Sequence, residues 1–152
     1  MRAAALGTVT RDWQMIEAMI DARPAFGVRL AFTTTAAGGR QRPLLGGSSI
    51  ETRMQYRPNW GLPGWPDGDQ TAGPVLGFTK SGISPGETTE AVIIPMFADH
   101  VPQWWDVGPG DVLRMYEGSR ICGIATILWA DRTALRLTDL EAERLLQRLQ
   151  AE

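Results

Sequence analysis

The chain has 152 residues, of which 43% are hydrophobic and 21% charged, and its formal net charge is −2 at pH 7. These values are close to those of ordinary globular domains, so they exclude wholesale disorder and allow folding without metal or disulfide support. A small negative charge also disfavours strong nonspecific binding to nucleic acid, since such binding depends on neutralising many phosphates.

Cys122 is the only cysteine in the chain, and His100 is the only histidine. A single cysteine excludes an intramolecular disulfide, and one histidine leaves a zinc site short of its usual ligands. Because Cys122 lies in an apolar run, we expect it to be a buried packing residue. We therefore expect neither a metal ion nor another cofactor.

The first residues contain too few consecutive apolar positions for the core of a signal peptide. No apolar run in the chain approaches the roughly 18 residues that a membrane-spanning helix needs. Together with the missing disulfide framework, these features predict a cytoplasmic protein without a membrane anchor.

The first predicted element is an amphipathic helix over residues 10–23. Trp13, Ile16 and Ile20 fall on one face of such a helix, and Pro24 would end it. Residues 28–35 are rich in β-branched and aromatic types and predict a first strand, which Gly38 and Gly39 would follow with a turn.

The strongest local strand signal lies in residues 50–56. Hydrophobic and polar residues alternate there with period two, which is typical of a strand with one buried face. Residues 58–74 are rich in Pro and Gly, and this composition predicts a long surface loop.

Residues 75–78 predict an edge strand. A turn at residues 84–86 then leads into a strand over residues 90–94, and residues 101–110 form a further predicted loop. Residues 112–116 and 121–129 are both strand-like and flank a short turn, so they predict a hairpin.

The last predicted element is a C-terminal helix. Thr138 and Glu141 have the spacing of a capping box, in which Thr138 would be the N-cap. An apolar stripe at helical spacing follows and predicts packing on the domain or on a partner, and its members are Ala142, Leu145, Leu146 and Leu149. Short strands, wide loops and a helix at each end together predict a small antiparallel barrel, because a βαβ fold would need helices between the strands.

Known catalytic motifs are missing. The chain has no phosphate-binding loop of the GTPase type and no glycine-rich dinucleotide motif, so we expect no bound nucleotide and no GTPase activity. Asp99 and His100 would be able to serve a nucleophile, but adjacent residues seldom orient each other as a dyad requires. We therefore expect no catalytic residues, and a surface-loop role for this pair is the simpler interpretation.

Four tryptophans lie in the predicted loops. Their side chains would be able to stack on the bases of single-stranded nucleic acid, or they would pack the loops onto the barrel. Sequence alone leaves both roles open for Trp60, Trp65, Trp104 and Trp105.

Five short segments resemble, in the same order, segments of the third domain of elongation factor Tu. They include a Gly-Gly-Arg turn, a Tyr-Arg-Pro run, a Pro-Gly-Glu turn and a hairpin with Glu-Gly at its tip. The matching residues are 38–45, 56–60, 84–87, 93–95 and 115–125.

This resemblance implies an all-β fold, a closed six-stranded antiparallel barrel of the domain-three type, over residues 26–130. The helices predicted from the sequence pattern add an N-terminal helical extension over residues 1–25 and a C-terminal helix over residues 131–152. The GTPase domain that accompanies this barrel in the family has no counterpart in the chain.

The resemblance also implies an RNA-binding surface, because the family's third domain contacts the T-stem of aminoacyl-tRNA. Arg40 and Arg57 would bind phosphate, and Gln41 and Asn59 would hydrogen-bond sugar or phosphate. Glu117 and Gly118 would approach the ribose. The alternative role for Arg40 and Arg57 is structural, in ion pairs with carboxylates such as Asp67, Asp69 or Glu117.

Two departures from the family pattern weaken the expected RNA contacts. Ile94 stands where the family often has a lysine before proline, and residues 45–56 form a longer stretch than in the family. We expect a non-catalytic binding module for a tRNA-like RNA or for a protein partner of the elongation factor Tu type. An accessory subunit that docks through its terminal helices, and a small enzyme that uses Asp99 and His100, are the alternatives.

Overall fold

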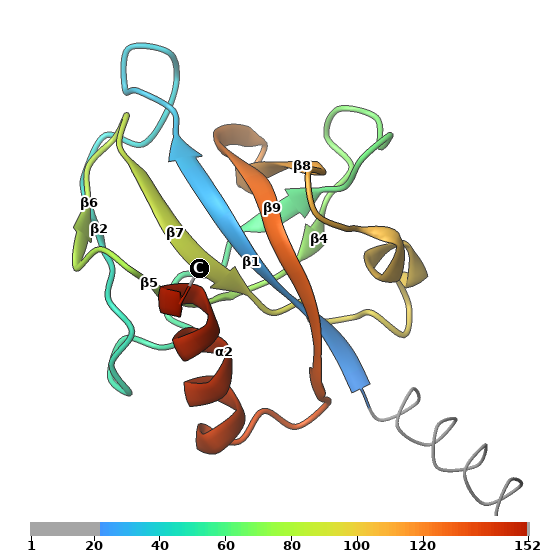
Figure 1. Ribbon diagram of the computed structural model, residues 1–152. Coiled ribbons are helices and arrows are strands. Elements are labelled where there is room, and N and C mark those ends of the chain that lie inside the picture. Colours follow the sequence, from blue (N-terminus) through green and yellow to red (C-terminus); the bar gives the residue numbers. More distant parts are fainter. Residues whose placement is uncertain (1–21, 152) are drawn as a thin grey trace, which may run out of the picture.

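In the computed structural model, which describes residues 22–151, the chain is mostly β, with one α-helix in the described part (Figure 1). The strands are β1 (Ala22–Phe32), β2 (Leu44–Leu45), β3 (Asn59–Gly61), β4 (Thr71–Ala72), β5 (Val75–Phe78), β6 (Gly82–Ile83), β7 (Thr88–Ile93), β8 (Val112–Glu117) and β9 (Arg120–Ala134). A 3₁₀-helix, η1 (Pro102–Asp106), lies before β8, and the helix α2 (Asp139–Ala151) ends the described residues.

Seven of these strands form one antiparallel sheet in the order β4-β3-β8-β9-β1-β7-β5, and β2 and β6 form a separate two-stranded sheet. At its centre, β1 pairs with β9 from Ala22 opposite Ala134 to Phe32 opposite Gly123. A bulge at Gly27 interrupts this pairing, and a Cβ there would lie 2.1 Å from the ring of Trp129. Glycine therefore leaves the space that the indole fills.

The sheet curls around the larger hydrophobic core. Side chains from β1, β3, β5, β7, β8 and β9 meet there, together with Trp104 of η1. Fully buried members of this core include Phe26, Leu30, Trp60, Ile93 and Leu113. Cys122 also lies in it, as predicted.

The helix α2 packs against the outer face of the sheet (Figure 1). Thr138 accepts a hydrogen bond from the amide of Glu141 at 3.2 Å, so the predicted N-cap is confirmed. The carboxylate of Glu141 binds Thr133 and Arg144. The predicted apolar stripe is buried against strand residues that face outward, and this second cluster includes Ala25, Leu76, Val92, Ile94, Trp129, Ala142, Leu145, Leu146 and Leu149.

The prediction for the start of the chain is wrong where the structure describes it. Residues 10–21 of the predicted helix lie outside the described residues, but Ala22 and Arg23 already belong to β1. Pro24 lies within this strand and does not end a helix, as had been expected. The strand β1 begins before the predicted residue 28 and ends at Phe32 rather than at residue 35. The β1–β9 pairing outweighs the local helical pattern.

The strand predicted over residues 50–56 is also wrong. Ser49 starts a turn there, with the amides of Thr52 and Arg53 both bonded to its carbonyl oxygen at 3.0 Å. Met54 has a φ of 61°, and Ile50 is 70% exposed. Met54 and Tyr56 pack against the two hydrophobic cores but are only partly buried. The segment belongs to no strand of either sheet in the described structure.

The predicted loop over residues 58–74 contains the strands β3 and β4. Asn59 and Trp60 pair with Ala72 and Thr71, and β3 also pairs with β8. Trp60 is fully buried, so its packing makes up for a composition that is poor in strand formers. Likewise, η1 occupies part of the loop predicted over residues 101–110.

Other predictions are confirmed. The strand β5 lies at the edge of the sheet, β8 and β9 form the predicted hairpin, and α2 is the predicted C-terminal helix. The edge strands β4 and β5 do not pair with each other, so strand pairing does not close the described sheet into a barrel. No helix in residues 22–151 has the length and hydropathy that crossing a bilayer requires.

Candidate functional site

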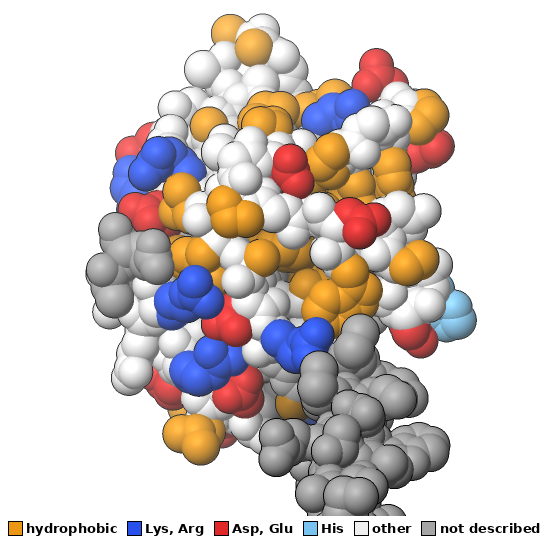
Figure 2. Space-filling model, turned by 45° about the vertical axis from the view of Figure 1, so that its right-hand side comes forward, with side chains coloured by type: hydrophobic (Ala, Val, Ile, Leu, Met, Phe, Trp, Pro, Cys, Tyr) orange, Lys and Arg blue, Asp and Glu red, His pale blue; other side chains and the backbone are white. Residues whose placement is uncertain are grey.

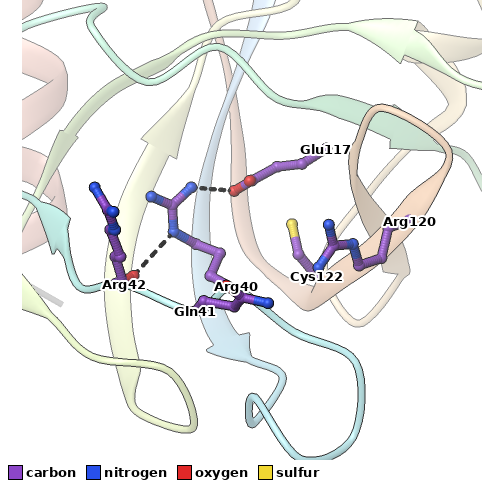
Figure 3. Close-up of a pocket in the computed structure, with 6 residues that line it drawn as sticks. All are labelled: Arg40, Gln41, Arg42, Glu117, Arg120 and Cys122. Atoms are coloured by element: carbon purple, nitrogen blue, oxygen red, sulfur yellow. Dashed lines mark hydrogen bonds and ion pairs between the residues drawn. The ribbon is translucent and has the colours of Figure 1, made fainter.

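A polar cavity of about 310 Å³ lies between the loop that follows β1 and the hairpin of β8 and β9. In Figure 3, the side chain of Arg40 lies between Arg42 and Glu117, and Arg120 approaches from the hairpin. The residues that line the cavity are Arg40, Gln41, Arg42, Glu117, Arg120 and Cys122. Three of the six residues predicted to bind RNA, Arg40, Gln41 and Glu117, are therefore brought together.

Arg40 is held by interactions within the chain. Its Nη1 donates to Oε2 of Glu117 at 2.5 Å, and its Nε donates to the carbonyl oxygen of Arg42 at 3.4 Å. The guanidinium also lies over the ring of Tyr56, 5.7 Å from the ring centre. Tyr56 in turn donates its hydroxyl hydrogen to the same oxygen of Glu117 at 2.5 Å. The structural role considered for Arg40 is thus confirmed, with Glu117 as its partner.

These contacts change the acidity of the buried groups. Burial alone would raise the pKa of Glu117, but hydrogen bonds from Tyr56 and Arg40 outweigh it and hold that pKa below its ordinary value. Burial, and then the bond to Glu117, raises the pKa of Tyr56. Burial raises the pKa of the Cys122 thiol to about 11. At neutral pH, Glu117 is therefore charged and Cys122 is a thiol rather than a thiolate nucleophile.

Two further arginines give the cavity its unbalanced positive charge. Arg42 is exposed and forms no ion pair in the described residues, and Arg120 makes only a long bond, at 3.4 Å, to the carbonyl oxygen of Gly39. With the Arg40 charge neutralised by Glu117, the cavity lining keeps a net charge of about +2 from Arg42 and Arg120.

Asn59 and Gly118 lie on a separate hydrogen-bond chain. The Asn59 amide donates to Gln70 at 3.0 Å, and the Gln70 amide donates to the carbonyl oxygen of Gly118 at 3.0 Å. Gly118 has a φ of 62° at the tip of the β8–β9 turn, a conformation that favours glycine. These polar groups therefore fix the hairpin tip against the loop after β3.

Arg57 does not line the cavity. Its Nε donates to the carbonyl oxygen of Met54 at 3.0 Å, and its side chain is exposed. The ion pair with a carboxylate that was considered for Arg57 is not formed in the described residues. Sequence reasoning assigned no role to Arg42 and Arg120, although both lie within segments that resemble the family, residues 38–45 and 115–125.

The pair Asp99 and His100 lies on the surface of the described structure. Their side chains are 3.5 Å apart but 72% and 79% exposed, and no hydroxyl or thiol contacts them in the described residues. No group of three or more metal-ligating side chains occurs within residues 22–151. No family model matches the chain, and no curated protein matches it significantly.

Proposed function

We propose that the chain is a non-catalytic binding module, built on a closed six-stranded antiparallel barrel of the type found in the third domain of elongation factor Tu. The order of the five resembling segments along the chain supports this proposal. The two edge strands support it too, because β4 and β5 are separated only by Gly73 and Pro74.

Backbone hydrogen bonds at this point support closure of the barrel. The amide of Val75 donates to the carbonyl oxygen of Tyr56 at 2.9 Å, on the side of β3. The amide of Ile94, just after β7, donates to the carbonyl oxygen of Pro74 at 2.9 Å. Residues 71–78 would therefore act as one bent strand that joins both edges of the sheet.

The ligand that we propose is the phosphate backbone of a tRNA-like RNA, bound at the polar cavity. The observation that carries this proposal is the pair of arginines, Arg42 and Arg120, that remain unpaired at a cavity with Arg40 and Gln41. Arginine suits planar, two-pronged contacts with phosphate. Gln41 would bond sugar or phosphate oxygens, and Arg40, held by Glu117, would position the loop.

Binding is expected to be weak and confined to this surface, because the whole chain is slightly acidic. The accessory-subunit alternative receives less support, because the apolar stripe of α2 is already buried against the sheet. We also propose that the protein is cytoplasmic.

A titration with mixed aminoacyl-tRNA tests the RNA proposal. Saturable binding is expected at about 50 mM salt, with much weaker binding at about 200 mM, since each phosphate contact adds about 0.7–0.9 to the salt slope. Arg42→Ala combined with Arg120→Ala should reduce that slope by about 1.5. Fluorescence anisotropy of labelled RNA measures both quantities.

Arg136→Ala is the matched control, since Arg136 is exposed in the segment before α2 and loses the same charge. It should leave RNA binding unchanged. Absence of binding at the lower salt concentration, or equal effects of the cavity and control variants, would contradict the RNA proposal.

A further inference from the structure

A second cavity, of about 570 Å³, lies between the loop that joins β3 to β4 and the helix η1. The residues that line it are Trp65, Gly68, Asp69, Gln70 and Gln103. Its volume falls within the range of sites that hold small ligands, so it has room for one nucleobase with its ribose.

The loop that supplies most of this lining is fixed by hydrogen bonds to β8. Arg114 Nη2 donates to the carbonyl oxygen of Trp65 at 2.7 Å. The amide of Gly68 donates to the hydroxyl oxygen of Tyr116 at 3.1 Å. These bonds hold the loop in place before any ligand arrives, and a preorganised site binds its ligand at a lower entropic cost.

Three side chains at the cavity keep groups that are free to bind. In residues 22–151, neither the Asp69 carboxylate nor the Gln103 amide forms a hydrogen bond or an ion pair, and both side chains are exposed. The ring of Trp65 packs against the larger core but is only half-buried, whereas Trp60 and Trp104 are fully buried. The cavity therefore brings together an aromatic ring, a carboxylate and a side-chain amide.

The charges around the cavity disfavour a phosphate as its ligand. Asp69 is the only charged residue in the lining, and in the same loop Asp67 is paired with Arg114 at 3.5 Å, so their charges offset each other. In Figure 2, acidic side chains are spread over the right-hand part of the face, whereas basic side chains gather mostly on the left. A fitting ligand group is therefore uncharged, flat, and able to donate hydrogen bonds to a carboxylate.

Guanine meets these requirements better than the other three bases of RNA. Its Watson–Crick edge carries two adjacent donors, N1–H and the N2 amino group, and one carboxylate accepts from both. Adenine and cytosine each place a ring-nitrogen acceptor beside the amino group, and this acceptor would repel the carboxylate. Uracil has a single donor between two carbonyl oxygens. The amide of Gln103 would donate to O6 of guanine, and the ring of Trp65 would stack on the base.

The cavity borders the same hairpin turn as the proposed RNA site. Gln70, in its lining, donates to the carbonyl oxygen of Gly118 at the tip of the turn. Glu117 and Arg120, on either side of Gly118, line the arginine-rich cavity. A strand of RNA that crosses the turn would therefore pass from one cavity to the other.

We propose that this second cavity binds an unpaired guanine base of the RNA. Trp65 stacks on the base, Asp69 accepts hydrogen bonds from its N1–H and N2 amino groups, and Gln103 donates to its O6. The proposal rests on the RNA-binding function proposed above, but recognition of the base is separate from the phosphate contacts of Arg42 and Arg120.

Short single-stranded RNAs test the proposal on the full chain. The first is a run of uridines with one central guanosine, and two others carry adenosine or inosine at that position. At about 50 mM salt, the guanosine RNA should bind about tenfold more tightly than the adenosine RNA, since one well-formed pair of hydrogen bonds discriminates between bases by at least this factor. Inosine lacks the N2 amino group and should fall between the two. Fluorescence anisotropy of labelled RNA measures the affinities.

Asp69→Asn is the most informative variant, because Asp69 is exposed and its replacement should leave the fold intact. An amide matches the N1 acceptor and amino group of adenine but no longer accepts from both guanine donors, so the preference for guanosine should fall about tenfold. Asp67→Asn removes a charge from the same loop outside the lining and should leave the preference unchanged. Trp65→Phe keeps an aromatic ring and should retain most of the binding, whereas Trp65→Ala should weaken it about tenfold.

Free guanosine, which carries no phosphate, separates this proposal from the phosphate contacts. It should bind more weakly than the RNA, shift the Trp65 indole signal in NMR spectra, and bind equally well to Arg42→Ala combined with Arg120→Ala. Equal affinity for the guanosine and adenosine RNAs would overturn base recognition and leave the phosphate contacts standing. A guanosine preference without any salt dependence would contradict the phosphate contacts instead. Free guanosine that binds as tightly as the RNA would overturn the proposal by assigning the cavity to a nucleoside.

Discussion

The Oε2 atom of Glu117 accepts hydrogen bonds from both Arg40 and Tyr56, so the charge of this carboxylate decides whether the cluster holds together. Hydrogen bonds to a charged acceptor are stronger than those between neutral groups. The cluster joins the loop after β1 to the hairpin of β8 and β9, and it therefore fixes the shape of the cavity where Arg42 and Arg120 lie.

Glu117→Gln should lower the free energy of unfolding by about 1–2 kcal/mol at pH 7, because glutamine loses the charge that both donors share. The folded-state pKa of Glu117 is lowered from 4.5, so its contribution is present above that pH and is lost as the pH falls through the folded pKa. The difference between wild type and variant should therefore shrink below about pH 4.5. Urea unfolding at pH 7, 5, 4 and 3 measures it.

Glu90→Gln is the control for this experiment, since the Glu90 side chain makes no hydrogen bond or ion pair in the described residues. It should cost little at any pH. A Glu117→Gln effect that stays constant from pH 7 to pH 3 would show that the charge of Glu117 is not what holds the cluster.

Sequence patterns picked out Arg40, Gln41 and Glu117 of the cavity but left two roles open for Arg40 and Glu117. These two residues are 77 positions apart; the resemblance assigned both to RNA, and an ion pair between them was the structural alternative. Their pairing with each other depends on the β8–β9 hairpin folding against the loop after β1, which no local pattern encodes. Glu117 pairs with Arg40, and Arg42 forms no ion pair in the described residues.

At the scale of elements, local sequence patterns predict a helix or strand correctly where the residues that stabilise it lie close to it in the chain. The β8–β9 hairpin and α2 were predicted because a turn or a cap lies next to the residues that it organises. Residues 50–56 alternate as a strand does, but Ser49 starts a turn, Met54 has a positive φ, and none of these residues belongs to a strand in the described structure. The strand β3 was missed because its stability comes from the burial of Trp60.

The docking of α2 yields a prediction at this scale. Leu145 is fully buried between the helix and the sheet, so Leu145→Ala should lower the free energy of unfolding by about 2–4 kcal/mol. Leu140→Ala changes the same side chain on the same helix, but Leu140 is 82% exposed and its loss should cost less than about 0.5 kcal/mol. Urea denaturation measures both values. Similar effects of the two variants would contradict the docked position of α2.

At the scale of the whole molecule, the two cavities differ in charge. One is lined by three arginines and one glutamate, so two of its positive charges lack an acidic partner, and the other has Asp69 as the only charged residue in its lining. Both surfaces depend on the curl of the sheet, because each is built from loops that belong to strands on different sides of it.

Closure of that sheet at Gly73 is the feature on which the barrel proposal depends. A Cβ on Gly73 would lie 2.8 Å from the buried ring of Trp60, whose Nε1 also donates to the Gly73 carbonyl oxygen at 2.7 Å. Gly73→Ala should therefore lower the free energy of unfolding by about 1–3 kcal/mol, as overpacking of a core does. Gly108→Ala is the control, since a Cβ there has open space and no unusual backbone angle.

Hydrogen exchange distinguishes a closed barrel from an open sheet whose core the Gly73→Ala substitution merely overpacks. In a closed barrel, the amide of Val75, bonded to Tyr56, should exchange as slowly as central amides such as that of Leu30 in β1, because both open only on global unfolding. In Gly73→Ala, the Val75 amide should lose more protection than the Leu30 amide. Fast exchange of Val75 in the wild-type chain would mean that β4 and β5 are ordinary free edges, and the sheet would then be an open one that resembles a barrel only in its curvature.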